Sequence, residues 1–129
     1  MFYFSQRSLS NMTGVDERLI SVAKHAIVIS HIDFGIPQTG GVRTAATQFQ
    51  LFQDGKSKAD GYKKRSKHQD GEALDFYAYV DGEASWDHCH LSMVANAMLQ
   101  AAVTLGIKIK WGGLFHDFID MPHLELVRD

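Results

Sequence analysis

Cysteine and proline are scarce in this chain of 129 residues, which contains one cysteine, Cys89, and two prolines, Pro37 and Pro122. A single cysteine forms no intrachain disulfide, so packing, with or without a metal ion, has to hold the fold, and a reducing compartment is the expected site of synthesis. No apolar run approaches the roughly 20 residues that span a bilayer, and the N-terminus lacks the apolar core of a signal peptide. The sequence therefore predicts neither a secretory leader nor membrane insertion.

The chain also lacks an excess of basic residues, with 13 Lys and Arg against 15 Asp and Glu and a formal net charge of −2. This balance argues against a general nucleic-acid binder, which neutralises phosphates with many cations. A hydrophobic share of 45% is typical of a globular fold. Because the length suits one core and no repeat is present, we expect a single domain over residues 1–129.

Three segments predict helices because their apolar residues recur at three- and four-residue spacing. The first is expected from Val15 to about Ser30, with Thr13 or Asp16 as its N-cap. The second is expected over Thr44–Gln53, whose apolar side chains are available for packing.

The third and longest helix is expected over Trp86–Leu105, between Ser85 as N-cap and Gly106 as stop signal. Its apolar stripe includes Cys89, which is expected to be a small buried side chain rather than a nucleophile. The neighbouring histidines, His88 and His90, point to nearly opposite sides of a helix, so they do not share a metal ion.

Strands are expected at Ala73–Val80, Ile107–Trp111 and His123–Val127, whereas the polar stretch 54–72 is expected to be a long loop. Helices and strands do not alternate regularly along the chain. The sequence therefore predicts an α+β fold, with helices on one side of a small antiparallel sheet.

Seven histidines are present, and one of them lies in the densest chemical signal, residues 66–75. His68 ends the polar loop, Gly71 permits a turn, and Asp75 lies in the next strand. An imidazole and a carboxylate placed in this way can converge on one ion, and His123 is the best third ligand. Zinc binds His nitrogen and carboxylate oxygen at about 2.0–2.2 Å, and its catalytic sites use three protein ligands.

Two stretches carry a family resemblance. Residues 66–75, SKHQDGEALD, resemble the SxHxxGxAxD motif of zinc DD-peptidases of the VanY and VanX type, and residues 111–125 resemble that family's closing WGG…DxPHxE pattern. The segments 11–15 and 41–44 further resemble the L-alanyl-D-glutamate peptidase branch found among bacteriophage endolysins. The resemblance covers nearly the whole chain, from about Ser10 to the end, and implies the zinc DD-peptidase fold, also called hedgehog-like.

The resemblance implies one zinc ion held by His68, Asp75 and His123, with Asp120 as the catalytic base. Glu125 competes for the role of base, because it shares a strand face with His123. We favour Asp120 as the base and Glu125 as a group that supports a ligand from behind.

Further roles come from the resemblance alone. It implies that Arg43 contacts a substrate carboxylate or the developing oxyanion, for which a planar guanidinium is suited. It also places Ser66 and Gln48 along the substrate groove. The chain departs from the family pattern at Phe115, where tryptophan is common, and at Leu124, where phenylalanine is frequent; both substitutions stay apolar.

The function implied is that of an endolysin: a zinc metallopeptidase that cuts the L-alanyl-D-glutamate bond of peptidoglycan stem peptides. It would be a monomer without a separate wall-binding domain, made in the host cytoplasm and released to the wall by a holin. Two alternatives stay open, a D-alanyl-D-alanine carboxypeptidase or dipeptidase on the same scaffold and a non-catalytic zinc-containing binding module.

A run of basic residues precedes His68 and could attract anionic wall polymers through an electrostatic field that salt screens. The run consists of Lys56, Lys58, Lys63, Lys64, Arg65 and Lys67.

Overall fold

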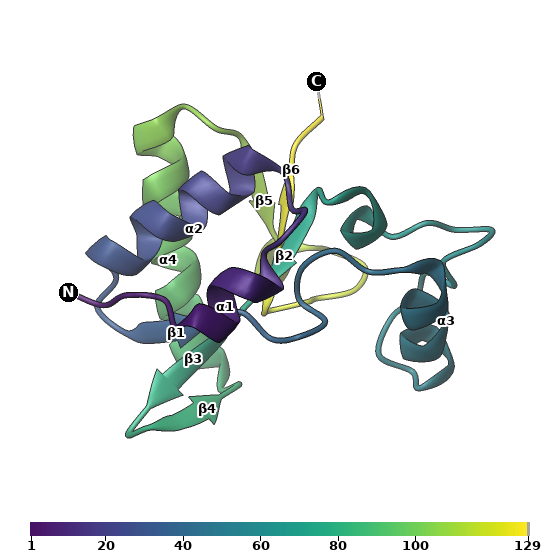
Figure 1. Cartoon of the computed structure of the whole chain (residues 1–129), viewed down its shortest axis with the longest axis horizontal. Helices are drawn as coiled ribbons and strands as arrows, with labels where there is room; N and C mark the ends of the chain where they lie inside the picture. Colours follow the sequence, from purple (N-terminus) through teal and green to yellow (C-terminus); the bar gives the residue numbers. More distant parts are fainter. Residues whose placement is uncertain (129) are drawn as a thin grey trace.

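The computed structural model describes residues 1–128, so the last residue of the expected domain, residue 129, lies outside the described part. In chain order the elements are α1 (Gln6–Asn11), α2 (Glu17–Ile29), β1 (Asp33–Gly35), α3 (Ala45–Gln53), the 3-10 helix η1 (Lys67–Asp70), β2 (Ala73–Asp75), β3 (Tyr77–Val80), β4 (Glu83–Ser85), α4 (His88–Leu105), β5 (Ile109–Trp111), the 3-10 helix η2 (Gly112–Leu114) and β6 (His123–Leu126). Helices and small antiparallel sheets are mixed, which confirms the expected α+β class (Figure 1).

Helices α2 and α4 pack against each other and supply much of the core (Figure 1). Helix α2 begins at Glu17 because the side chain of Asp16 accepts a hydrogen bond from the backbone N–H of Arg18, as an N-cap does. Its buried face consists of Leu19, Val22, Ala23, Ala26 and Ile27. Among the described residues, no helix is long and apolar enough to cross a membrane.

Helix α4 begins later than expected, and this changes the environment of Cys89. Its N-cap is Asp87, which accepts from the Cys89 N–H, whereas Ser85 ends β4 and accepts from the Asp87 N–H instead. Cys89 therefore lies in the exposed first turn, and the prediction that it is buried is wrong. The buried stripe consists of Leu91, Val94, Ala95, Ala97, Met98, Ala101 and Ala102. Gly106 ends the helix at φ 71°, as expected.

Within residues 1–128 the strands form two three-stranded antiparallel sheets where one was expected, with strand orders β1-β3-β4 and β2-β6-β5. The strand expected over residues 73–80 divides at Phe76, whose side chain is fully buried and whose N–H donates to the carbonyl of Pro122 at 2.9 Å. Residues before Phe76 pair with β6, and those after it pair with β1. Residues 73–80 read as one continuous strand in the sequence, so the sequence pattern alone does not reveal the division.

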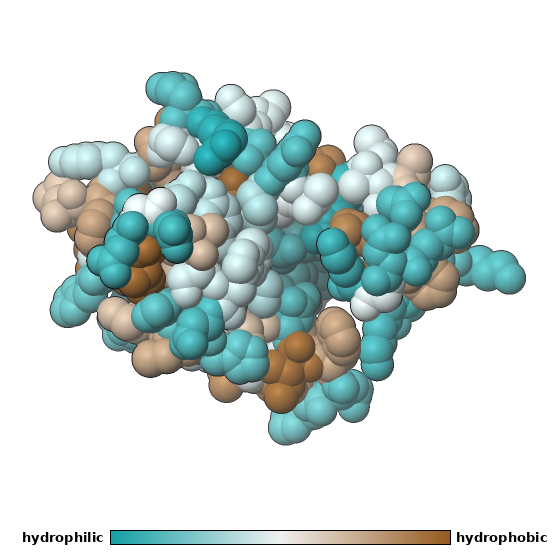
Figure 2. Space-filling model, turned by 90° about the horizontal axis from the view of Figure 1, so that it is seen from below, coloured by the Kyte–Doolittle hydropathy of each residue, from teal (hydrophilic) through white to brown (hydrophobic). Residues whose placement is uncertain are grey.

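Helix α3 and the segment that follows it project from the rest of the molecule, on the right of Figure 1. Thr44 caps α3, which ends at Gln53 as expected, but Phe49 and Phe52 are partly exposed rather than packed in the core. The predicted loop 54–72 is correct apart from η1. Seen from below, the space-filling view shows a hollow between this projecting part and the main body (Figure 2).

Candidate metal centre

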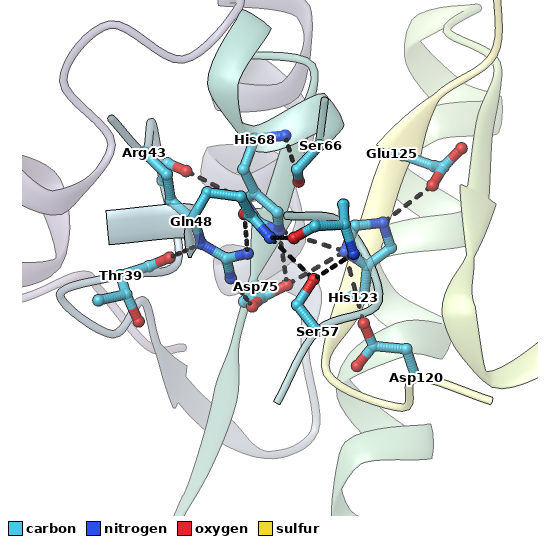
Figure 3. A network of polar contacts seen from close by, with 12 residues as sticks. Thr39, Arg43, Gln48, Ser57, Ser66, His68, Asp75, Asp120, His123 and Glu125 are labelled. Carbon is cyan, nitrogen blue, oxygen red and sulfur yellow. Dashed lines mark hydrogen bonds and ion pairs between the residues drawn. The ribbon is translucent and has the colours of Figure 1, made fainter. Parts of the chain in front are cut away.

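Three side chains predicted as metal ligands converge where η1, β2 and β6 meet (Figure 3). His68 Nε2 lies 3.2 Å from Asp75 Oδ1, and His123 Nδ1 lies 3.2 Å from the same oxygen. The two imidazole nitrogens are 3.3 Å apart. All three ligand atoms thus lie within 4.8 Å of one another, a spacing that could hold a metal ion.

The ring of His68 is fixed before any ion binds. Its side chain is only 2% exposed, and Nδ1 lies 3.0 Å from the carbonyl oxygen of Gly41. Because a carbonyl only accepts, Nδ1 carries the hydrogen, and the lone pair of Nε2 is left for the ion. The backbone below the ring is held by a capping box, in which Ser66 and Gln69 each bond to the other's backbone. Ser66 thus shapes η1 as well as lining the cleft.

His123 is oriented by Glu125, two residues along the same strand. Its Nε2 lies 2.9 Å from Glu125 Oε1, so Nε2 carries a hydrogen and Nδ1, which faces Asp75, is the nitrogen that would bind an ion once its own proton has left. Glu125 Oε2 in turn pairs with Lys67 Nζ at 2.9 Å. Burial acts to lower the pKa of His123, but its hydrogen bonds to Asp75 and Glu125 outweigh burial and raise the pKa to about 9. Hydrogen bonds from His123 and Lys67 lower the pKa of Glu125 to about 2.

Asp75 receives a third polar contact, from Arg43. Its Oδ2 accepts from Arg43 Nη2 at 2.9 Å, while Oδ1 faces the two histidines. Burial acts to raise the pKa of Asp75, but the neighbouring His68 and His123 hold it below its usual range. Asp75 is therefore an anion at neutral pH, the form that binds metals.

Arg43 is held on three sides, and Gln48 is one of its supports. Besides Asp75, the guanidinium donates from Nε to the carbonyl of Thr39 at 2.7 Å and from Nη1 to Gln48 Oε1 at 3.1 Å. Gln48 is completely buried, and its amide nitrogen donates to Ser57 Oγ and the carbonyl of Ala59, each at 2.8 Å. Gln48 thus lies behind Arg43 and does not reach the groove where it was expected.

Asp120 lies beside the ligand group without joining it, since its Oδ2 is 3.9 Å from His123 Nδ1 (Figure 3). Burial, and then the negative charge of Asp75, raise the pKa of this carboxyl group. The backbone of Asp120 is fixed by Gly112, whose carbonyl accepts from the Asp120 N–H at 2.9 Å. A Cβ at position 112 would collide with the Asp120 carbonyl oxygen, so only glycine permits this approach.

A cleft of about 930 Å³ opens onto the three ligands and Asp120, in the hollow of Figure 2. Phe115, His116 and Phe118 line one side, and Lys58 Nζ lies 5.0 Å from the centre of the Phe118 ring. Four residues of the basic run also line the cleft: Lys56, Lys58, Lys64 and Lys67.

The sequence predicted the ligand residues, Asp120 and the support that Glu125 gives to His123, but not the other groups that hold the site. The carbonyls of Gly41 and Thr39 carry no side-chain signal, and the Lys67–Glu125 ion pair joins residues 58 positions apart. The GVRT segment was a hint to part of this support, because it contains both Arg43 and Gly41, whose carbonyl holds His68.

The donor set fits a transition metal, because two imidazole nitrogens and one carboxylate oxygen are ligands that zinc accepts. Both histidines have a second hydrogen bond that fixes the tautomer, as metal-binding histidines usually do. With a carboxylate beside the group and an open cleft in front of it, the site has the groups that a metal-dependent hydrolase would use, and its three ligands could hold an ion.

Comparison with known proteins identifies the family. The model of the phage L-alanyl-D-glutamate peptidase family matches residues 1–127. The chain is 36% identical to the L-alanyl-D-glutamate peptidase of Escherichia phage T5 over an alignment of 138 positions, gaps included, which covers 98% of each protein. The crystal structure of the L-Ala D-Glu endopeptidase ChiX of Serratia marcescens superposes with a TM-score of 0.85 at 31% identity, covering 97% of this chain and 90% of that one. This chain belongs to the phage L-alanyl-D-glutamate peptidase family.

Proposed function

We propose that the chain is a zinc-dependent endopeptidase that hydrolyses the L-alanyl-D-glutamate bond of peptidoglycan stem peptides. The observation that carries this proposal is the convergence of His68, Asp75 and His123 beside Asp120 at the floor of the cleft. Family membership supplies the bond, because both relatives are named for the L-alanyl-D-glutamate linkage. Nothing in these relatives favours the alternative D-alanyl-D-alanine specificity.

The three ligands would hold one zinc ion, which when bound polarises a carbonyl and lowers the pKa of water. Asp120 is the general base: it takes the proton from the attacking water and passes it to the departing amine of D-glutamate. Its raised pKa brings its basicity closer to that needed at neutral pH. Glu125 bonds to His123 on the side away from the ligand atoms, which supports Asp120 rather than Glu125 as the base.

Arg43 orients the substrate through those of its N–H donors that do not bond to Thr39, Gln48 or Asp75. A guanidinium has five N–H donors, and three of them bond to Thr39, Gln48 and Asp75. The remaining two can meet a carboxylate or the oxyanion of the scissile carbonyl. Because Gln48 and Thr39 fix the plane of the group, little ordering is required when substrate binds.

The biological role we propose is that of an endolysin, made in the host cytoplasm as a monomer and reaching the wall after a holin opens the membrane. The lysines along the cleft attract the carboxylates of stem peptides.

The test is hydrolysis of purified peptidoglycan, followed by the appearance of new amino groups. We expect activity in the zinc-loaded protein, loss with a chelator and recovery when zinc is added back. The His68→Ala variant should show no recovery. Full hydrolysis by metal-free protein, or none by zinc-loaded protein, would overturn the proposal.

A further inference from the structure

A second depression, of about 630 Å³, lies beyond the loop that borders the metal centre. It is framed by α1, the β3–β4 hairpin and the chain between β4 and α4. Its volume falls within the range of about 300–1,000 Å³ typical of small-molecule sites. Neither the metal centre nor the proposed catalytic groups use it.

Aromatic rings form one wall of this depression. The rings of Tyr77 and Trp86 lie 5.6 Å apart with an interplanar angle of 34°, and the hydroxyl groups of Tyr77 and Tyr79 are 2.6 Å apart. Trp86 is 51% exposed, although an indole ring is among the most costly side chains to leave in water. An exposed indole that continues a packed aromatic wall is typical of a ligand platform.

Polar side chains, one of them the cation Arg7, line another part of the depression. Arg7 is hydrogen bonded to Tyr79, and this contact raises the pKa of its guanidinium. Asn11 and Gln38 add amide groups to the lining. Among the described residues that line the depression, only Arg7 is formally charged. The depression therefore suits a neutral ligand rich in hydroxyl and amide groups better than a polyanion.

The depression adjoins the catalytic cleft. Gln38 lines the depression and its neighbour Thr39 lines the cleft. Likewise the ligand Asp75 faces the cleft, while Tyr77, two residues on, faces the depression. Two residues of extended chain span at most about 7 Å, so backbone positions that line the two hollows lie close together. We infer from this that a ligand longer than one amino acid can reach from one to the other.

We propose that this depression is a saccharide subsite that binds the glycan strand of peptidoglycan while the stem peptide lies in the cleft. The inference rests on the proposed function. In peptidoglycan the L-alanine of the stem is joined directly to muramic acid, so a sugar lies one residue from the bond that is cut. The C–H face of a pyranose ring packs on the exposed indole of Trp86, which lies against the ring of Tyr77, and its hydroxyl and acetamido groups bond to Arg7, Asn11 and Gln38.

The kinetic test compares two substrates that share one peptide. The first is a disaccharide-linked stem peptide, and the second is the same peptide with only an acetyl group on L-alanine. We expect Trp86→Ala to lower kcat/KM for the disaccharide-linked peptide roughly threefold to tenfold, which is the effect of losing one aromatic contact. The kcat/KM for the acetylated peptide should stay unchanged. Trp86→Phe should retain most of the preference, and Tyr3→Ala, at an exposed aromatic residue outside the depression, should change neither substrate. Equal losses on both substrates would overturn the proposal.

Binding of the free disaccharide tests the subsite independently of peptidase activity. In NMR spectra of nitrogen-15-labelled protein, the indole N–H signal of Trp86 should shift as N-acetylglucosaminyl-N-acetylmuramic acid is added, while that of Trp111 should stay in place. Absence of any shift in Trp86 at saturating sugar would contradict the subsite, even if the peptide is cleaved. A shift without peptide cleavage would uphold the subsite and contradict the proposed function.

Discussion

Asp75 and His123 are paired residues in the β2–β6 ladder, and Asp75 Oδ1 lies 3.2 Å from His123 Nδ1. Two of the three candidate ligands are therefore placed by the register of an antiparallel pair rather than by flexible loops. A slip of one residue would turn one of these side chains to the other face of the sheet. The fully buried pair next to them, Leu74 and Leu124, holds the register.

Glu125→Gln should weaken zinc binding about 10–100-fold, because a neutral amide supports the His123 ring less well than a carboxylate. The measurement is competition with a chromogenic chelator. Glu83→Gln, at an exposed glutamate on β4, is the matched control and should bind zinc as the unmodified protein does. Unchanged affinity in the Glu125 variant would show that this contact does not tune the site.

Asp120→Asn should lower kcat about 100- to 10,000-fold, the usual contribution of a general base, while zinc affinity changes far less than in Glu125→Gln. Steady-state kinetics on a stem peptide, with metal content measured on the same sample, separates the two effects. Asp81→Asn, in an exposed turn, should leave both properties unchanged. If the Asp120 variant stays active with zinc bound, the base is another residue and Glu125 becomes the first candidate.

Zinc binding at pH 7 should release about one proton from His123. In the metal-free protein the pKa of His123 is about 9, so the ring is protonated at pH 7, whereas zinc binds the neutral ring. Asp75, with its lowered pKa, is already ionised and contributes none. Affinity should thus rise about tenfold per pH unit up to pH 9 and then level off. Calorimetry in buffers of different ionisation enthalpy measures the proton count, and a count of zero at pH 7 would contradict this account.

Gly112→Ala should reduce activity at least about tenfold, because the added Cβ displaces the Asp120 backbone and a shift of about 1 Å in a catalytic group is costly. Gly106→Ala is the control, since it strains a helix end at φ 71° with no neighbour within 4 Å of the added carbon. It should lower Tm by a few degrees yet leave kcat unchanged. Equal kcat values in the two variants would mean that Gly112 does not position Asp120.

The sequence predicted the residues that carry the chemistry of the site better than the residues that hold them in place. His68, Asp75, Asp120 and His123 stand in two spaced motifs, and the structure brings all four together. Gln48 is a polar residue whose position matched the family groove, but its amide group bonds to Arg43, to the hydroxyl of Ser57 and to the carbonyl of Ala59 instead. A motif indicates that a residue type is needed at a position, but it does not indicate whether that residue contacts the substrate or another side chain.

The fold was predictable where local signals agree and not where tertiary contacts decide. Asp16 caps the start of α2 and Gly106 caps the end of α4, as expected, because capping is a local effect. The division at Phe76 depends on the distant Pro122, and the exposure of Cys89 depends on which of two caps starts α4. Helix α1 and strands β1 and β4 were missed, since each has six residues or fewer and too little periodicity to detect.

The most direct test of the central claim is mass spectrometry of the peptides and muropeptides released from purified peptidoglycan by the zinc-loaded protein. We expect stem peptides that begin with D-glutamate and glycan fragments that end in L-alanine, both absent when a chelator is present. Release of D-alanine with intact L-alanyl-D-glutamate bonds would contradict the proposed function.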